Sequence, residues 1–304
     1  MSDPILYYSE KSLHCHRVRV ALYEKGIRYK QRCMDVAALE NLSDWFVKIN
    51  PDTKVPTLRH GDKILTDPDD IIRYLDDAFV GKSRLFPDAS TEEGKMCEYF
   101  IRIAEKIDIN TLALAIPELP GFDEYKLKNS YPTSYYRDLM KGFQDKAPEL
   151  CEKMAERYPE LKTTYDDIRE KAEKIRLSPD DETLGVALPL STDVMTKLEM
   201  ELKRNKDAKG KMTWLCGETF TAADIYFSTT LRALYDLGLD DTFWGNEQRP
   251  LVAEYFLKGR TQSSFVQTAP ALDDGAYVMK MRVVQPEVKG QGQPCCGEYP
   301  CTII

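Results

Sequence analysis

The sequence has no excess of basic residues and no long apolar run, and each shortage excludes a class of protein. Its 42 lysines and arginines stand against 50 acidic residues, a formal net charge of −8. Binding to nucleic acid needs clustered positive charge, so we expect no nucleic-acid partner. The best apolar stretch, at 112–116, ends at Pro117 and is far shorter than the roughly 20 residues of a membrane-spanning helix.

Signs of secretion are also missing. The N-terminus, MSDPILYYSE, has neither the basic region nor the apolar stretch of a signal peptide. Eight cysteines scattered over 304 residues are more typical of reduced thiols than of a disulfide framework. We therefore expect a protein of the cytoplasmic side.

Within the first 80 residues, short apolar strands alternate with helices. PILYY favours a strand, the apolar spacing at 18–22 a helix that Gly26 ends, and the alternation at 27–33 a second strand. SDWFVKI predicts a short helix and TLRHGDKILT a hairpin. In DPDDIIRYLDDAF, Asp67 suits the N-cap and Pro68 the first helical position. The order is β-α-β followed by β-β-α.

From residue 91 onward the pattern is helical. The strongest signal is FTAADIYFSTTLRALYDLGL, where Thr221 and Asp224 form a capping box. Apolar residues at steps of three and four between 150 and 175 predict one stripe on a long helix, kinked or broken at Pro159. We expect this stripe to pack on its own helical bundle, with a partner-binding helix as the alternative. From about residue 280 the chain is rich in Gln, Gly and Pro, as linkers are.

Several of these stretches resemble the glutathione transferase superfamily. LYYSEKSLHCHRVRVALYEKGIRY is similar to the first strand, active-site loop and first helix of its serine-type classes, TKVPTL to its cis-proline loop, and TAAD to its C-terminal capping box. The resemblance implies an α/β plus all-α fold, with a thioredoxin-like N-terminal domain and an all-helical C-terminal domain. We expect these domains at 4–80 and 91–279, joined by a linker at 81–90. A flexible tail is expected at 280–304.

A further resemblance is to the ganglioside-induced differentiation-associated protein (GDAP) family. It rests on KMAERYPELKTTYDDIREKAEKIRL, WLCGETFTAADI and FWGNEQRPLVAEYF. That family carries extra helical sequence, expected here at about 145–177, and is implicated in mitochondrial dynamics. The resemblance implies a homodimer as one arrangement and the mitochondrial outer membrane as one location. The GDAP relatives end in a transmembrane anchor that this sequence lacks.

The superfamily resemblance also supplies a candidate glutathione site. The serine-type catalytic position falls on Ser12, whose hydroxyl would stabilise the glutathione thiolate; Ser12 is equally suited to cap the following helix. Cys15 is a second candidate as a redox thiol, although an inert buried thiol is the better interpretation. His14 and His16 have no evident third ligand, so we expect two solvated histidines and no metal site.

The rest of the expected glutathione site is only partly preserved. Lys54, Val55 and Pro56 form the loop whose main chain would pair with the cysteinyl part of glutathione, with a cis bond before Pro56. Asp67 would receive the γ-glutamyl ammonium. Pro68 stands where active families place Ser or Thr, and it offers neither an N–H nor a hydroxyl to the ligand carboxylate. The acids at 69 and 70 add repulsion.

The chain ends in CCGEYPCTII, which fits a lipidation pattern. Cys301-Thr302-Ile303-Ile304 matches the C-a-a-X prenylation motif, and Cys295 and Cys296 are palmitoylation candidates. One lipid gives only marginal membrane residence, so a second signal is needed. A disordered tail with incidental cysteines is the alternative interpretation.

These observations predict a GDAP-like protein with the glutathione-transferase fold. It would act at the cytoplasmic face of a membrane, held by its lipids, with weak or absent transferase activity. The first alternative is an active glutathione transferase that conjugates glutathione to electrophiles at Ser12. The second is a thiol-dependent reductase or dehalogenase that uses Cys15, although the cysteine of the bacterial dehalogenase relatives falls one position away, on His14.

Overall fold

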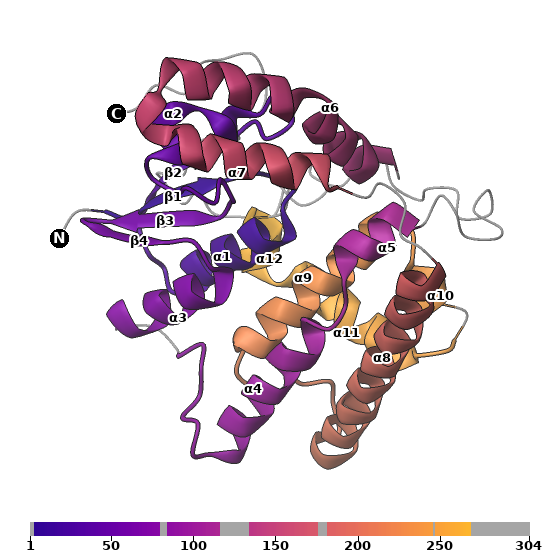
Figure 1. Cartoon of the computed structure of the whole chain (residues 1–304). Coiled ribbons are helices and arrows are strands. Elements are labelled where there is room, and N and C mark those ends of the chain that lie inside the picture. Colours follow the sequence, from indigo (N-terminus) through magenta and orange to yellow (C-terminus); the bar gives the residue numbers. More distant parts are fainter. Residues whose placement is uncertain (1–2, 80–83, 116–133, 176–180, 246, 269–304) are drawn as a thin grey trace.

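The N-terminal part of the molecule is built on one mixed four-stranded sheet (Figure 1). The computed structural model describes residues 3–79, 84–115, 134–175, 181–245 and 247–268. The strand order is β2-β1-β3-β4, with β1 at Ile5–Tyr8, β2 at Lys30–Cys33, β3 at Thr57–His60 and β4 at Lys63–Leu65. β1 runs parallel to β2 and antiparallel to β3, and β3 and β4 form the predicted hairpin.

Helices cover both faces of this sheet. Because side chains alternate along a strand, Leu6 and Tyr8 of β1 join one apolar cluster while Tyr7 joins another. The first cluster includes α1 (Leu13–Glu24) and α3 (Pro68–Ala78); the second includes α2 (Asp44–Val47), which follows the short 3₁₀ turn η1 (Glu40–Leu42). This is the predicted thioredoxin-like arrangement.

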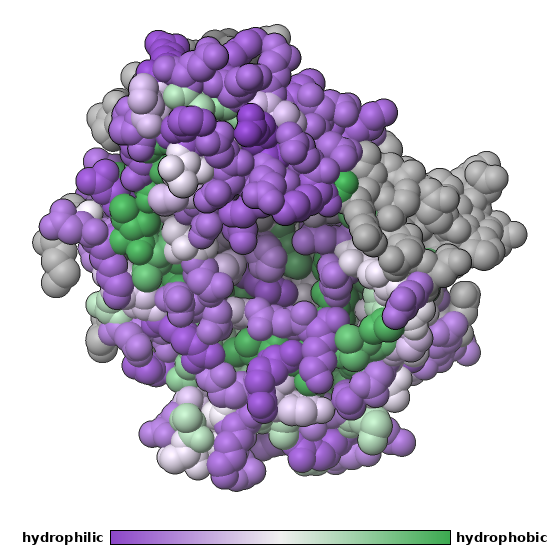
Figure 2. All heavy atoms as spheres, in the orientation of Figure 1, coloured by the Kyte–Doolittle hydropathy of each residue, from purple (hydrophilic) through white to green (hydrophobic). Residues whose placement is uncertain are grey.

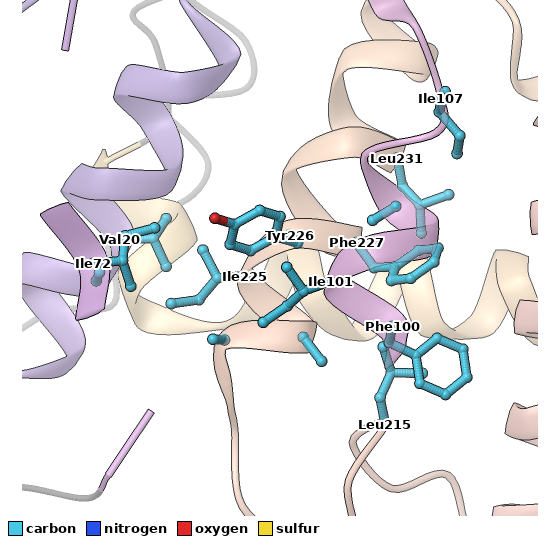
Figure 3. Close-up of a cluster of buried hydrophobic side chains, with 14 of the residues drawn as sticks. Val20, Ile72, Phe100, Ile101, Ile107, Leu215, Ile225, Tyr226, Phe227 and Leu231 are labelled. Atoms are coloured by element: carbon cyan, nitrogen blue, oxygen red, sulfur yellow. The ribbon is translucent and has the colours of Figure 1, made fainter. Parts of the chain in front are cut away.

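A second, all-helical part follows, as the sequence predicted. Its helices are α4 (Glu92–Ala104), α5 (Ile109–Ala115), α8 (Asp181–Lys209), α9 (Ala222–Asp236), α10 (Asp240–Phe243), α11 (Pro250–Thr261) and α12 (Ser263–Thr268). α9 is buried along most of its length and packs against α1, α4 and α11. Figure 3 shows part of the resulting core, in which Val20 of α1 and Ile72 of α3 join the same apolar cluster as Ile225 of α9. The predicted capping box of Thr221 and Asp224 is present at the start of α9.

The expected single stripe between 150 and 175 is a helical hairpin instead. α6 (Ser134–Arg157) and α7 (Lys162–Glu173) lie side by side at the top of Figure 1 and are joined by the 3₁₀ turn η4 (Pro159–Leu161). The chain breaks near Pro159 as predicted, but there it reverses, because the turn lets the two apolar faces meet.

The apolar face of the α6–α7 hairpin packs on the thioredoxin-like part rather than on the helical bundle, which α6 contacts at α5, so the expected packing surface was wrong. Its apolar face covers η1 and α2 of the thioredoxin-like part, in one cluster of buried residues: Leu39, Leu42, Val47, Ala147, Cys151, Ala155, Tyr165, Ile168 and Ala172. The buried hydroxyl of Tyr165 donates a hydrogen bond to the backbone carbonyl of Leu42 at 3.0 Å. The hairpin is therefore an added layer on the N-terminal domain.

A buried ion pair anchors the linker between the two domains. Lys25 and Asp76 are both fully enclosed, and the Lys25 Nζ lies 2.8 Å from the Asp76 Oδ1. The same carboxylate accepts the backbone N–H groups of Leu85 and Phe86. The described part of the expected linker, 84–90, is thus anchored to the end of α3 over its first residues.

The predicted tail at 280–304, with Cys295, Cys296 and Cys301, lies outside the described residues. Among the helices that the structure describes, none combines the length and apolar character needed to cross a bilayer.

Candidate functional site

Ser12 occupies the loop between β1 and α1, at the N-terminus of the helix. Its Oγ accepts a hydrogen bond from the backbone N–H of Cys15 at 3.3 Å, so the serine is the N-cap of α1. Its side chain is partly exposed. Its hydroxyl also lies within hydrogen-bonding reach of the Cys15 thiol. Capping uses a lone pair of Oγ rather than its O–H, so the two interpretations of Ser12 are compatible.

Glu10, two residues before Ser12, anchors the loop through two hydrogen bonds. One carboxylate oxygen of Glu10 accepts the Tyr8 hydroxyl at 3.0 Å, and the other accepts the Arg19 guanidinium at 2.8 Å. Glu10 and Tyr8 are buried and Arg19 nearly so. Sequence reasoning missed this anchor. Its only signal was a charged residue that follows directly on a buried strand.

Cys15 is fully buried one turn into α1. The backbone N–H of Ser9 donates to its Sγ at 3.4 Å. Burial raises the pKa of the Cys15 thiol to about 11, although the hydrogen bonds from Ser12 and Ser9 act in the opposite direction. A thiol of this kind is protonated at neutral pH, which favours the inert interpretation.

The two histidines of α1 do not share one environment, so the expectation of a solvated pair was wrong for His16. His14 is exposed, whereas His16 is buried and its ring packs edge-on against Phe265 of α12 at 5.0 Å. Burial holds the pKa of His16 well below its usual range. The part of the chain that the structure describes contains no group of three or more His, Cys, Asp and Glu side chains able to hold a metal ion.

The peptide bond between Val55 and Pro56 is cis, as predicted. The bend is held by the buried amide of Asn50, whose Nδ2 donates to the carbonyl of Lys54 at 2.9 Å and to the Thr57 Oγ1 at 3.0 Å. The backbone groups of Val55 make no backbone hydrogen bond to the other described residues. They remain free to pair with an extended peptide such as glutathione.

Asp67 is exposed at the start of α3 and is the N-cap of that helix. Its Oδ1 accepts the backbone N–H groups of Asp69 and Asp70 at 2.9 and 3.1 Å. Pro68, at the first helical position, has no N–H. The two N–H groups that would meet a ligand carboxylate at this helix end are therefore occupied by the protein's own carboxylate.

The acid at position 69 is not free to repel a ligand, which changes the expectation from sequence. Its Oδ1 accepts the hydroxyl of Tyr226 of α9 at 3.0 Å, and its Oδ2 lies 2.6 Å from the Arg73 Nε. Arg73 also forms a two-point ion pair with Glu98 of α4. Asp69 thus joins the two domains, whereas Asp67 and Asp70 are exposed at this helix end and form no ion pair with another described residue.

A buried arginine lies deeper between the domains. Arg17 of α1 stacks over the ring of Tyr226 at 4.2 Å and donates to the hydroxyls of Thr229 and Thr230 at 3.4 and 3.1 Å. Its carboxylate partner, Glu105 at the end of α4, is 3.8 Å away and half exposed. Burial raises the pKa of Glu105, against the pull of Arg17.

The Ser12 loop, the cis-proline loop and the start of α3 lie near one another around His14. The charges of Asp67 and Lys54 both act on the imidazole of His14, beside Ser12. Figure 2 shows the surface hollowed between the lobe that carries α6 and α7 and the helical domain, with apolar surface visible in the hollow. A hydroxyl, a main-chain edge and a helix end are the kinds of group with which a thiol-containing peptide such as glutathione would pair.

Both halves of this architecture match known families. Residues 6–83 match the glutathione S-transferase N-terminal domain, and residues 165–258 match the glutathione S-transferase C-terminal domain. The chain belongs to the glutathione S-transferase superfamily.

Particular relatives show a range of roles. Human ganglioside-induced differentiation-associated protein 1-like 1 is 25% identical to this chain, in an alignment that covers 86% of this chain and 72% of the human protein. The tetrachloro-p-hydroquinone reductive dehalogenase of Sphingobium chlorophenolicum is also 25% identical, over 87% of this chain and 95% of its own. Among solved structures, the beta-etherase LigF of Sphingobium sp. strain SYK-6 superposes with a TM-score of 0.59 at 19% identity, covering 88% of this chain and 98% of its own.

Proposed function

We propose that this is a glutathione-transferase-fold protein that binds glutathione weakly and works at the cytoplasmic surface of a membrane. The observation that carries the weak binding is the N-terminus of α3. There the Asp67 carboxylate takes the N–H groups of Asp69 and Asp70, and Pro68 supplies no donor. A γ-glutamyl carboxylate would meet acidic side chains and satisfied donors.

The expected effect on affinity follows from the missing donor. A hydrogen bond to a charged group contributes about 1.5–3 kcal/mol. Its loss weakens binding roughly tenfold to a hundredfold. The neighbouring Val55 edge and the Ser12 hydroxyl still contribute, so binding is weakened rather than abolished.

Calorimetric titration of glutathione tests this proposal. Pro68→Ser restores an N–H and a hydroxyl and should strengthen binding by about tenfold. Adding Asp70→Asn should strengthen it further, because Asp70 is exposed and forms no described ion pair. The matched control is Asp62→Asn in the β3–β4 turn, which removes the same charge elsewhere. Micromolar binding by the unaltered protein would contradict the proposal.

The membrane part of the proposal rests on the C-terminal sequence and on similarity to the GDAP relatives. Prenylation of Cys301 and palmitoylation of Cys295 and Cys296 would supply the two signals that stable anchoring needs. Cys301→Ser should release the protein into the cytosol, whereas Cys295→Ser with Cys296→Ser should leave it reversibly attached. Cys33→Ser is the control. Fractionation of cells would also identify the membrane, for which the resemblance suggests the mitochondrial outer membrane. An intact mass with unmodified Cys301 followed by Thr-Ile-Ile would refute the anchoring.

A second function is favoured by the partly exposed hydroxyl of Ser12: conjugation of glutathione to electrophiles. The O–H can donate to the glutathione sulfur while Oγ still caps α1, which stabilises the thiolate and orients it for attack. The test is conjugation to 1-chloro-2,4-dinitrobenzene. Ser12→Ala should lower kcat/KM at least tenfold, and Ser12→Thr, which keeps both hydroxyl roles, should retain most activity. Equal activity in Ser12→Ala would exclude this role.

A further inference from the structure

Two cysteines far apart in the sequence are in contact inside the helical domain. Cys97 is 1% exposed on α4, and Cys216 is half-buried in the turn that precedes α9. The thiols of Cys97 and Cys216 are hydrogen-bonded to each other. Neither residue takes part in the candidate glutathione site.

The turn that carries Cys216 is held rigidly. The backbones of Trp214 and Gly217 exchange two hydrogen bonds, of 2.8 and 3.2 Å. Gly217 has a φ of 115°, a conformation that favours glycine. The N–H of Leu215 donates to the buried carboxylate of Asp224 at 2.9 Å. Cys216 is therefore held at a fixed place against α4.

The surroundings of Cys97 are equally fixed. Its Sγ lies 4.0 Å from the carbonyl oxygen of Leu85, which also accepts the N–H of Ala222 at the start of α9. Phe100, one turn further along α4, and Leu215 belong to the same apolar cluster (Figure 3). The two sulfur atoms are thus carried by elements that are hydrogen-bonded and packed against one another.

The pair differs from the other buried thiols of the described chain. The hydrogen bond between the two thiols lowers the pKa of Cys97 and raises the pKa of Cys216, whereas burial raises the pKa of Cys15 and of Cys151 to about 11. A thiolate held by a neighbouring S–H is the reactive form of cysteine, and a second sulfur in contact can trap its oxidation product. Cys216 gives the pair its access to solvent.

We propose that Cys97 and Cys216 are a redox-active pair that hydroperoxides oxidise to a disulfide, which fastens α4 to the turn before α9. A thiolate of the pair attacks the peroxide oxygen, the O–O bond breaks, and a sulfenic acid and hydroxide form. The second sulfur then attacks the sulfenic sulfur and expels hydroxide. With hydrogen peroxide, two thiols and one H₂O₂ give one disulfide and two waters. A thiol reductant returns the pair to its starting state.

The disulfide should make the protein more resistant to unfolding. It would close a loop of more than a hundred residues between two fixed elements, and such a cross-link restricts the unfolded chain. We expect the Tm of the oxidised protein to rise by about 5 °C or more.

The experiment uses the full chain with Cys295, Cys296 and Cys301 changed to Ser, so that only the described cysteines remain. The protein is treated with hydrogen peroxide, blocked with N-ethylmaleimide and digested with trypsin. Peptides 96–102 and 212–232 each contain one cysteine of the pair. We expect them to be joined, at a mass two hydrogens below their sum, and to separate after reduction.

Two variants make the result decisive. Cys216→Ala, at the half-buried turn, should abolish both the joined peptide and the peroxide-dependent rise in Tm. Cys33→Ala removes a half-buried thiol outside the pair and should leave both unchanged. Sulfinic acid on Cys216 with Cys97 still free, or linkage of Cys216 to another cysteine, would overturn the proposal. So would a joined pair whose Tm is equal to or below that of the reduced protein.

Discussion

Replacing Asp224 with alanine tests how the helical domain is held together. The carboxylate is 0% exposed and accepts four hydrogen bonds. They come from the backbone N–H of Thr221 at 2.9 Å, the Thr221 hydroxyl at 2.9 Å, the N–H of Leu215 at 2.9 Å and the Tyr255 hydroxyl at 2.7 Å. Two of these bonds reach beyond the capping box. Burial raises the pKa of Asp224, and the four donors oppose that rise.

The loss of unfolding free energy in Asp224→Ala shows whether the carboxylate only caps α9 or also satisfies buried donors outside the cap. Loss of a cap alone costs about 1 kcal/mol. Asp224→Ala would also leave the Leu215 N–H and the Tyr255 hydroxyl buried without an acceptor, and each such group costs about 1–3 kcal/mol. We therefore expect the free energy of unfolding to fall by about 3–5 kcal/mol.

Urea titration followed by circular dichroism and by fluorescence of Trp214 measures this loss. Trp214 is a suitable reporter because its ring packs against Phe220 and Tyr255. Tyr255→Phe is the control: it removes one donor, leaves three on the carboxylate and should cost about 1 kcal/mol. If Asp224→Ala costs no more than Tyr255→Phe, the carboxylate acts only as a helix cap and the reasoning fails.

Three other expected outcomes follow from buried groups. Cys15 should resist alkylation by iodoacetamide at pH 8, because only about one Cys15 thiol in a thousand is ionised there. The rate of alkylation should rise as the pH approaches 11. Rapid alkylation of the folded protein at pH 8 would contradict the burial of Cys15. Lys25→Met removes the buried cation of Asp76 and leaves the carboxylate only the exposed Arg84, so it should lower the free energy of unfolding by about 3 kcal/mol; a neutral result in urea titration would show that the buried pair is dispensable. Tyr165→Phe should cost about 1 kcal/mol and increase hydrogen exchange near Leu42, while the helical domain exchanges as before.

Local signals in the sequence were enough to predict much of the N-terminal domain. The helix start at Asp67-Pro68 and the hairpin at 57–65 depend on neighbouring residues only, and both are present. The cis bond before Pro56 was implied by the resemblance to the glutathione transferase superfamily, and it is present too. The capping box of α9 is local in the same sense.

The errors concern contacts between distant segments. The helix-start position of His16 suggested solvent, but α12, almost 250 residues later, covers it with Phe265. The charge of Asp69 was expected to repel a ligand carboxylate, but Tyr226 and Arg73 both form hydrogen bonds to it. Periodicity at 150–175 identified an apolar face correctly and could not say which surface that face would cover. The lipidation and domain-boundary predictions remain predictions.

The docking of the α6–α7 hairpin also determines when the N-terminal domain is complete. On a ribosome, the sheet and its first helices emerge well before residues 147–172, which cover Leu39, Leu42 and Val47. The bond from Tyr165 to Leu42 spans 123 positions, and contacts this distant form late because the closing loop is long. A nascent chain therefore carries an exposed apolar face on an otherwise folded domain until more than half of the protein has been translated, and during that interval it is a natural client for chaperones.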